Sequence, residues 1–218
     1  MGIDEEAKKY WNDMADFAEF STPLQIDLFK EYVDTKSCIL DYGCGYGRTL
    51  NELETNGYKC LFGVDFSAKM IDRGREKYPG LNLIVNHGNE IPFEADIFDV
   101  VILLSVFTCN YRDEEQNRIM QEVKRVLKPE GLIYINDFLI NTDERYVQRY
   151  DMFKDAYGQY GIFELRGTSG ATILRHHSIE RITEMTGSFK PIAFERLTYT
   201  TMYGNKSNGF YYLGKNLK

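Results

Sequence analysis

Near residue 40 the chain passes from an apolar stretch through a glycine-rich turn into a helical pattern. Asp41 ends the apolar stretch, glycines follow at alternate positions (Gly43, Gly45 and Gly47), and the helical pattern begins at Arg48. Glycine lets the backbone approach a ligand closely and adopt a positive φ, and the start of a helix presents unpaired N–H groups. This stretch therefore predicts an α/β protein that binds a nucleotide-like ligand at a strand-to-helix turn.

The spacing of these glycines differs from that of two common nucleotide-binding motifs. Glycines at alternate positions do not match G-x-G-x-x-G, the dinucleotide fingerprint, and the sequence contains no phosphate loop ending in Gly-Lys-Ser/Thr. The spacing therefore argues against a nicotinamide-dependent oxidoreductase, which a binding titration with NAD would test.

Strand-like and helix-like segments alternate through the middle of the chain. Predicted strands cover residues 37–42, 59–64, 81–86, 97–105 and 132–138, and predicted helices cover residues 48–56, 68–78 and 114–127. The nearly continuous apolar run at 97–105 is typical of a central strand buried on both faces. This alternation predicts an α/β fold of the Rossmann-like three-layer type, with a mostly parallel sheet and right-handed crossovers.

The other segments flank this core. Helical spacing predicts a helix over residues 4–20, and Ser21-Thr22-Pro23 resembles the start of a second helix. Residues 141–175 have no clear strand pattern but carry aromatic residues at three- and four-residue steps, which favours a cap or lid. We expect a single domain with four parts: N-terminal helices (1–36), a binding core (37–138), a cap (139–178), and a last helix with an antiparallel strand pair (179–218).

Composition restricts the partners and the compartment. The net charge of −7 over 218 residues argues against nucleic acid as a partner. The longest apolar runs are too short to span a bilayer, and the acidic N-terminus does not resemble a signal peptide. We therefore expect a cytoplasmic protein with no membrane partner. The four cysteines form no C-x-x-C pair, which favours buried reduced thiols over a metal or disulfide framework.

Four motifs in a fixed order resemble the class I S-adenosylmethionine-dependent methyltransferases, in particular the UbiE-like group that acts on small molecules. They are Ile39-Leu40-Asp41-Tyr42-Gly43-Cys44-Gly45-Tyr46-Gly47, Gly63-Val64-Asp65-Phe66-Ser67, Gly88-Asn89-Glu90-Ile91-Pro92-Phe93 followed by Phe98-Asp99-Val100-Val101, and Glu122-Val123-Lys124-Arg125-Val126-Leu127-Lys128-Pro129-Glu130-Gly131-Leu132. The motifs cover roughly residues 37–138. The resemblance implies a seven-stranded sheet whose last strand is antiparallel.

The resemblance also implies which residues bind S-adenosylmethionine and its product S-adenosylhomocysteine. The glycines at 43, 45 and 47 would let the backbone pass close to the amino acid and ribose portions, and Asp41 would meet the ammonium group. Asp65 would accept hydrogen bonds from both ribose hydroxyls, the role that an acid has after the second strand of dinucleotide folds. A purely structural role for Asp65, as the cap of the next helix, is less favoured because Ser67 already supplies a cap.

Five further residues are implied at the same site. Phe66 would pack on the adenine face, Asn89 would bond the adenine amino group where the family more often has Asp, and Glu90 would contribute its backbone N–H. Leu104 and Ser105 would lie near the transferred methyl group. Asn89 could instead be a plain turn residue.

Two aromatic and two histidine positions leave alternatives open. Tyr10 and Trp11 are either core anchors of the first helix or, as in related enzymes, aromatic residues that close over the methionine end. His176 and His177 are weak candidates for a general base, and in an extended chain they face opposite sides. A purely structural role for the two histidines, at the entry to the last helix beside Ser178, is favoured.

The sequence thus predicts a methyltransferase (EC 2.1.1.-) that transfers a methyl group to a small-molecule oxygen, nitrogen or carbon acceptor by in-line displacement. No cluster of metal ligands is visible, so no metal is expected. The alternatives are a methyltransferase acting on a protein substrate and a non-catalytic S-adenosylmethionine sensor, for which a homodimer built on the aromatic cap is an option. The acceptor is expected to depend on residues 1–36 and 139–178.

Overall fold

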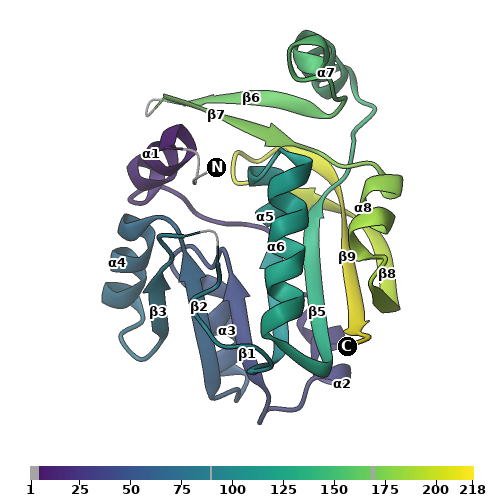
Figure 1. Ribbon diagram of the computed structural model, residues 1–218. Helices are drawn as coiled ribbons and strands as arrows, with labels where there is room; N and C mark the ends of the chain where they lie inside the picture. Colours follow the sequence, from purple (N-terminus) through teal and green to yellow (C-terminus); the bar gives the residue numbers. More distant parts are fainter. Residues whose placement is uncertain (1–4, 89, 168–169) are drawn as a thin grey trace.

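The computed structural model describes residues 5–88, 90–167 and 170–218 (Figure 1). In chain order the elements are α1 (Glu5–Met14), α2 (Ile26–Tyr32), β1 (Cys38–Tyr42), α3 (Arg48–Thr55), β2 (Cys60–Asp65), α4 (Ala68–Lys77), β3 (Asn82–Val85), β4 (Phe98–Leu104), α5 (Val106–Cys109), α6 (Asp113–Val126), β5 (Leu127–Phe138), α7 (Glu144–Tyr157), β6 (Ile162–Gly167), β7 (Gly170–Arg175), α8 (Ile179–Thr186), β8 (Phe189–Thr200) and β9 (Lys206–Asn216).

Seven of the strands form one mixed sheet in the order β3-β2-β1-β4-β5-β9-β8. Neighbouring strands from β3 to β5 pair in parallel, whereas β9 pairs antiparallel with both β5 and β8. The predicted fold class, a mostly parallel seven-stranded sheet with an antiparallel last strand, is confirmed. Because parallel strands place their carboxyl ends at one edge, the turns that follow β1, β2 and β4 lie side by side.

Helices cover both faces of the sheet, and each face has its own hydrophobic core. On one face, side chains such as Val101 and Ile133 pack against Val123 of α6 and Ile182 of α8. On the other face, alternate strand residues such as Ile39 and Val100 pack against α2, α3 and α4. The strands are apolar on both faces because both faces are buried, as the run at 97–105 predicted.

The chain before β1 differs from the prediction. Helix α1 ends at Met14 rather than near residue 20, and α2 begins at Ile26, so Pro23 is not the first residue of a helix. The segment between them (residues 15–25, here called the N-terminal strap) runs in extended or turn conformation over the glycine turn. Arg73 of α4 fixes the strap by donating hydrogen bonds to the carbonyl oxygens of Ala15 and Ala18, at 2.8 and 2.6 Å.

The cap contains a structure that the sequence pattern did not reveal. Strands β6 and β7 form an antiparallel hairpin where no strand was expected. In Figure 1 this hairpin and α7 lie beyond one end of the main sheet, with β7 beside α1. Strand formation in a hairpin depends mainly on packing against the partner strand, so it does not require a regular alternation of apolar and polar residues. Residues 162–175 lack this alternation, which is why the sequence pattern did not predict the two strands.

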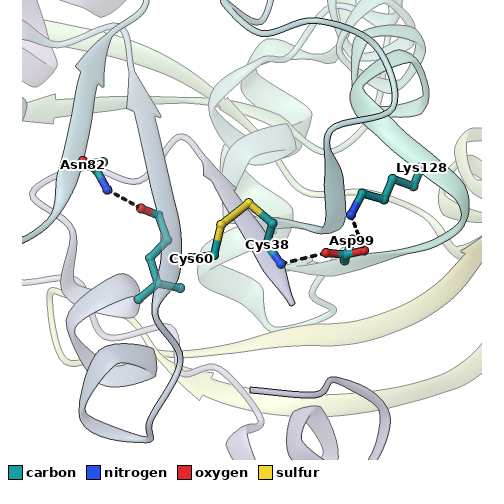
Figure 2. Close-up of a disulfide and its surroundings, with 6 residues drawn as sticks. Cys38, Cys60, Asn82, Asp99 and Lys128 are labelled. Carbon is teal, nitrogen blue, oxygen red and sulfur yellow. Dashed lines mark hydrogen bonds and ion pairs between the residues drawn. A yellow bond between two sulfur atoms is a disulfide. The ribbon is translucent and has the colours of Figure 1, made fainter. Parts of the chain in front are cut away.

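The expectation that all four cysteines are reduced is wrong for two of them. Cys38 and Cys60 are directly opposite each other on β1 and β2, their Cα atoms are 4.6 Å apart, and they form a disulfide (Figure 2). Their juxtaposition depends on strand register, which the sequence spacing did not indicate. Cys44 and Cys109 are free thiols. Among the helices described here, none combines the length and the apolar character that crossing a membrane requires.

Candidate functional site

A cavity of about 700 Å³ lies between the carboxyl ends of β1, β2 and β4 and the cap. The lining on the sheet side comes from the glycine turn and from the ends of these strands, and the lining on the other side comes from α7, β6 and β7. Trp11 and Phe20 complete the wall from α1 and the N-terminal strap. The cavity is therefore at the edge of a parallel sheet where α/β folds bind their ligands.

The glycine turn at the cavity floor depends on backbone conformations that favour glycine. Gly43, Gly45 and Gly47 have φ values of +75°, +54° and +83°. The backbone N–H groups of Gly43 and Cys44 both donate to the carbonyl oxygen of Val64, which ties the turn to β2. A side chain at any of the three would be strained by its own backbone, and at Gly43 or Gly45, which line the cavity, it would also lack space beside Val106 or Phe20.

Asp65, the last residue of β2, is buried with its carboxylate at the cavity. One oxygen accepts the N–H of Gly45 at 2.9 Å and the other accepts the N–H of Ser67 at 2.8 Å. Burial raises the pKa of Asp65 to about 6, although these two hydrogen bonds favour the charged form. Each oxygen keeps an acceptor site, so the carboxylate can accept two hydroxyl groups of a ligand.

Asp41, at the end of β1, is buried to 2% exposure beside the same cavity. Among the residues described here, its carboxylate has no hydrogen-bond partner. Burial raises its pKa to about 7, Arg48 acts in the opposite direction, and Asp65 adds to the rise. A buried carboxylate without a partner is costly unless a ligand compensates it, and a cationic ligand group would do so.

Most residues predicted at the site line this cavity. The structure brings together Trp11, Asp41, Gly43, Gly45, Asp65, Phe66, Leu104, Ser105 and His176. Gly47 does not line it; a Cβ there would meet Leu81 and Leu83, so this glycine serves the packing of the turn. Glu90 is exposed away from the cavity. Asn89 lies outside the described residues.

The two N-terminal aromatic residues have different surroundings. Trp11 lines the cavity, whereas Tyr10 is buried at 1% exposure and its hydroxyl lies 3.2 Å from that of Tyr203. Phe20, which the sequence analysis did not single out, lines the cavity and stacks on Tyr46 at 5.4 Å between ring centroids. Its position depends on the extended strap, whereas the sequence predicted that residue 20 would be part of a helix.

The two histidines are also separated by the structure. His176 is buried and lines the cavity. His177 faces the opposite side, where its Nε2 lies 2.8 Å from Nε2 of Gln116, and burial lowers its pKa to about 3. Of the two histidines, only His176 therefore has its ring at the cavity. The hydrogen bonds of this ring determine which of its nitrogens carries the proton.

The cap contributes residues that the sequence analysis missed. Arg145, Tyr146 and Arg149 of α7 line the cavity opposite Asp65. The aromatic spacing predicted the tyrosine, but the arginines on the same helix resembled ordinary solvent-exposed charges. No group of three or more potential metal ligands occurs within the described parts of the chain.

Comparisons with known proteins agree with this geometry. The family described as "Methyltransferase domain" matches residues 40–135. An uncharacterized methyltransferase of Oceanobacillus iheyensis is 25% identical over 115 residues, which are 52% of this chain and 53% of the relative. The ubiquinone/menaquinone biosynthesis C-methyltransferase UbiE of Geotalea daltonii is 32% identical over 130 residues, which are 56% of this chain and 51% of the relative. The chain thus spans about half the length of these two curated relatives.

A solved structure covers more of the chain. A SAM-dependent methyltransferase of Methanosarcina mazei superimposes with a TM-score of 0.82 at 25% identity, covering 87% of this chain and 97% of that protein. The similarity therefore includes parts of the cap and the C-terminal strands as well as the sheet, and the chain and this neighbour share one architecture.

Proposed function

Because the chain belongs to the class I S-adenosylmethionine-dependent methyltransferases, we propose that it transfers a methyl group to an oxygen, nitrogen or carbon atom of a small-molecule acceptor. S-adenosylmethionine supplies a methyl group on a sulfonium, which is a good leaving group. The chain's own residues then have to bind the cofactor and the acceptor, orient them, and exclude water from the site. Proximity and orientation account for most of the rate in such a displacement.

The residues at the cavity floor fit this cofactor. Asp65 has acceptor capacity for the two ribose hydroxyls, and Asp41 offers an uncompensated carboxylate to the ammonium group. The positive φ values of the glycine turn let its backbone approach the ligand without a side chain in the way. Leu104 ends β4 and Ser105 follows it; both line the cavity and would border the methyl group.

The observation that carries the proposal is the extent of the cavity. The same space that contains Asp65 continues to Tyr146 and His176 of the cap, so it has room for an acceptor beside the cofactor. A mainly apolar wall with a few polar groups is typical of small-molecule sites. The strap and hairpin on either side favour a small acceptor over a protein side chain.

Calorimetry and a turnover assay test the proposal together. We expect S-adenosylmethionine and S-adenosylhomocysteine to bind and NAD not to bind. Asp65→Ala should weaken binding by tens-fold or more, because two charge-assisted hydrogen bonds are lost. Asp99→Ala is the matched control, since Asp99 lies at the opposite end of β4 with Lys128 and the N–H of Cys38.

The turnover assay measures S-adenosylhomocysteine release with a low-molecular-mass metabolite extract. Release above the extract-free rate supports the proposal. Tight cofactor binding without release would favour a sensor, and release only with a protein fraction would favour a protein acceptor. Unchanged affinity in Asp65→Ala would contradict the placement of the cofactor.

A further inference from the structure

Two arginines of the cap face the cavity without an acidic partner. Arg145 and Arg149 are half-buried on α7. The structure gives them no ion pair or hydrogen bond within residues 5–88, 90–167 and 170–218. Other cavity arginines are compensated: Arg112 pairs with Glu115 at 2.9 Å and Arg166 with Glu164 at 2.7 Å. The cap side of the cavity therefore carries two uncompensated positive charges.

Helix stability does not explain these two positions. Arg145 lies in the first turn of α7, where the helix dipole disfavours a cation. Arg145 and Arg149 are also four residues apart, a spacing at which like charges destabilise a helix. A chain that keeps two arginines in such positions gains something other than helix stability from them.

Aromatic rings hold both guanidinium groups in place. The guanidinium of Arg145 lies 4.3 Å from the ring centroid of Tyr146, and that of Arg149 lies 5.5 Å from the ring of Phe163 and 6.0 Å from Tyr146. Stacking on a ring orients the planar guanidinium and leaves its N–H groups free. The two arginines are thus positioned to bind an anion with several hydrogen bonds.

His176 adds a neutral donor at the same place. Its ring lies 4.9 Å from that of Tyr146, and it is 3% exposed. Its Nδ1 lies 2.7 Å from the hydroxyl of Tyr150 and 3.1 Å from Nδ2 of Asn141. The described residues provide no partner for its Nε2.

The neighbours of His176 determine which nitrogen carries the proton. Asn141 accepts the N–H of Asn208 with its Oδ1, so its Nδ2, which donates to the Leu139 carbonyl and the Ser207 hydroxyl, is the end that faces Nδ1. The Tyr150 hydroxyl accepts the backbone N–H of Asn141, which leaves its own proton for Nδ1. Nδ1 has a single lone pair, which the Tyr150 hydroxyl at 2.7 Å can occupy as donor, and the Asn141 Nδ2 beside it offers no acceptor for a proton on Nδ1. This arrangement places the proton of the neutral ring on Nε2. Burial, with smaller contributions from His177 and both arginines, holds its pKa well below the usual range.

We propose that the methyl acceptor is an organic anion, and that Arg145, Arg149 and the Nε2–H of His176 bind its carboxylate or phosphate group. This inference rests on the proposed function and specifies the class of its acceptor. His176 then orients the acceptor by donating a hydrogen bond rather than accepting a proton from it. The reacting atom would lie toward Ser105, at the cofactor side of the cavity.

The test uses benzoate and phenyl phosphate as anionic probes and benzamide as their neutral counterpart. Each is titrated into the full chain saturated with S-adenosylhomocysteine and followed by NMR. An anionic probe should bind more tightly than benzamide, and the double variant Arg145→Gln/Arg149→Gln should weaken it by roughly tenfold or more, the scale of one lost charge-assisted interaction. Arg166→Gln, at the same cavity but paired with Glu164, is the matched control and should change it by less than about twofold.

Three outcomes would overturn the proposal. They are equal binding of benzamide and the anions, unchanged anion binding in the double variant, and a loss of S-adenosylhomocysteine affinity in that variant, which would assign the arginines to the cofactor. The imidazole ¹⁵N spectrum should show the Nε2–H form of His176, and an Nδ1–H form would remove His176 from the site. If the wild type binds no S-adenosylhomocysteine, the proposed function fails, and the same titration of the chain alone still tests the anion site.

Discussion

The ring of Phe20 lies against the backbone of Gly45, so the N-terminal strap covers the middle of the glycine turn. A Cβ built on Gly45 would collide with the Phe20 ring, and the same ring stacks on Tyr46 at 5.4 Å. The absence of a side chain at position 45 therefore has two uses: it permits the backbone conformation of the turn and it leaves room for the strap. The cofactor side of the cavity therefore depends on a contact between Phe20 and Gly45, which are 25 residues apart in the sequence.

A comparison of Gly45→Ala with a second glycine variant should separate the effect of backbone strain from the effect of displacing Phe20 on cofactor affinity. Gly45→Ala strains a residue at φ +54° and displaces Phe20, so we expect S-adenosylhomocysteine affinity to fall by roughly tenfold or more. The control is Gly57→Ala, at φ +95°, where a Cβ meets only Thr35 at 3.9 Å. It should cost about 1 kcal/mol of stability with little change in affinity. Equal affinities for the two variants would show that Phe20 does not matter to the site.

Arg73 should control how firmly the strap is held. It donates to the carbonyls of Ala15 and Ala18, pairs with Glu19 and lies 4.0 Å from the ring centroid of Tyr46. Arg73→Ala should release the strap, so limited proteolysis near the exposed Phe17 should accelerate several-fold.

The companion variant for Arg73 is Arg75→Ala on the same helix, which bonds Leu83 and does not touch the strap. Its cleavage rate should match that of the wild type. Bound S-adenosylhomocysteine should slow cleavage in the wild type if the strap closes over the ligand. Identical cleavage of both variants would indicate that Arg73 does not fasten the strap.

The sequence could predict the sheet side of the site because its determinants are local. The glycine turn, Asp41 and Asp65 each follow a short apolar strand, and parallel strands bring such ends to one edge whatever lies between them. This is why the fold class and most of the cofactor residues follow from motif order. The family match covers residues 40–135, the same region.

The cap and the strap could not be predicted in the same way because their contacts are long-range. Arg149 has the sequence context of a solvated helix face, and only the packing of α7 against β6 places it at the cavity. The β6–β7 hairpin lacks a regular alternation, and the disulfide depends on the register that sets Cys38 opposite Cys60. In each case the determinant is a neighbour that is distant in sequence.

The disulfide should affect stability but not the cofactor. Cys38 and Cys60 lie at the beginning of β1 and β2, close to Asp99 (Figure 2). The glycine turn follows the other end of β1. A cross-link between residues 22 positions apart constrains the unfolded chain, and its removal in Cys38→Ala/Cys60→Ala should cost roughly 3 kcal/mol. Denaturant unfolding measures this cost. Calorimetry should find S-adenosylhomocysteine affinity within about twofold of the wild type, and a large loss would show that this end of the sheet supports the site.

Cofactor affinity should depend on pH through Asp65. Accepting two N–H groups and two ribose hydroxyls requires the ionised carboxylate, whose pKa is raised by burial to about 6. The contribution of Asp65 to affinity should therefore be lost below this pKa by up to about tenfold per pH unit, because a proton must be removed before the ligand binds. Asp41, whose pKa burial raises to about 7, must also ionise to meet the ammonium group, so the loss of affinity should begin near pH 7 and become steeper below pH 6. Calorimetry between pH 5 and 8 checks the slope, and Asp65→Asn should bind weakly with a flatter profile. A pH-independent affinity of the wild type would contradict the assignment.

Asp41 should reduce the stability of the ligand-free chain at neutral and higher pH. Burial raises its folded-state pKa to about 7, well above the ordinary 3.8, so the folded chain holds this proton more tightly than the unfolded chain does. Stability from this group is present below pH 4 and is lost as the pH rises toward and through 7. Asp41→Asn removes the buried charge, so at pH 8 it should gain about 1 kcal/mol or more, a rise in Tm of roughly 2–4 °C. The gain should vanish near pH 4, where the wild-type Asp41 is already protonated, while at pH 8 S-adenosylhomocysteine affinity falls because the carboxylate that meets the ammonium group is lost.

Asp99→Asn is the matched variant for Asp41, because its effect should have the opposite sign. Burial acts to raise the pKa of Asp99, but Lys128 and the N–H of Cys38 outweigh it and the pKa is lowered. This carboxylate stabilises the fold above its unfolded pKa, and the contribution is lost as the pH falls through the folded value. Asp99→Asn should therefore lower the Tm at pH 8, where Asp41→Asn raises it, and should leave S-adenosylhomocysteine affinity unchanged. Thermal unfolding of both variants at pH 4 and pH 8 compares the two carboxylates directly. A lower Tm for Asp41→Asn at pH 8 would show that its charge is compensated in the ligand-free chain and is not reserved for the cofactor.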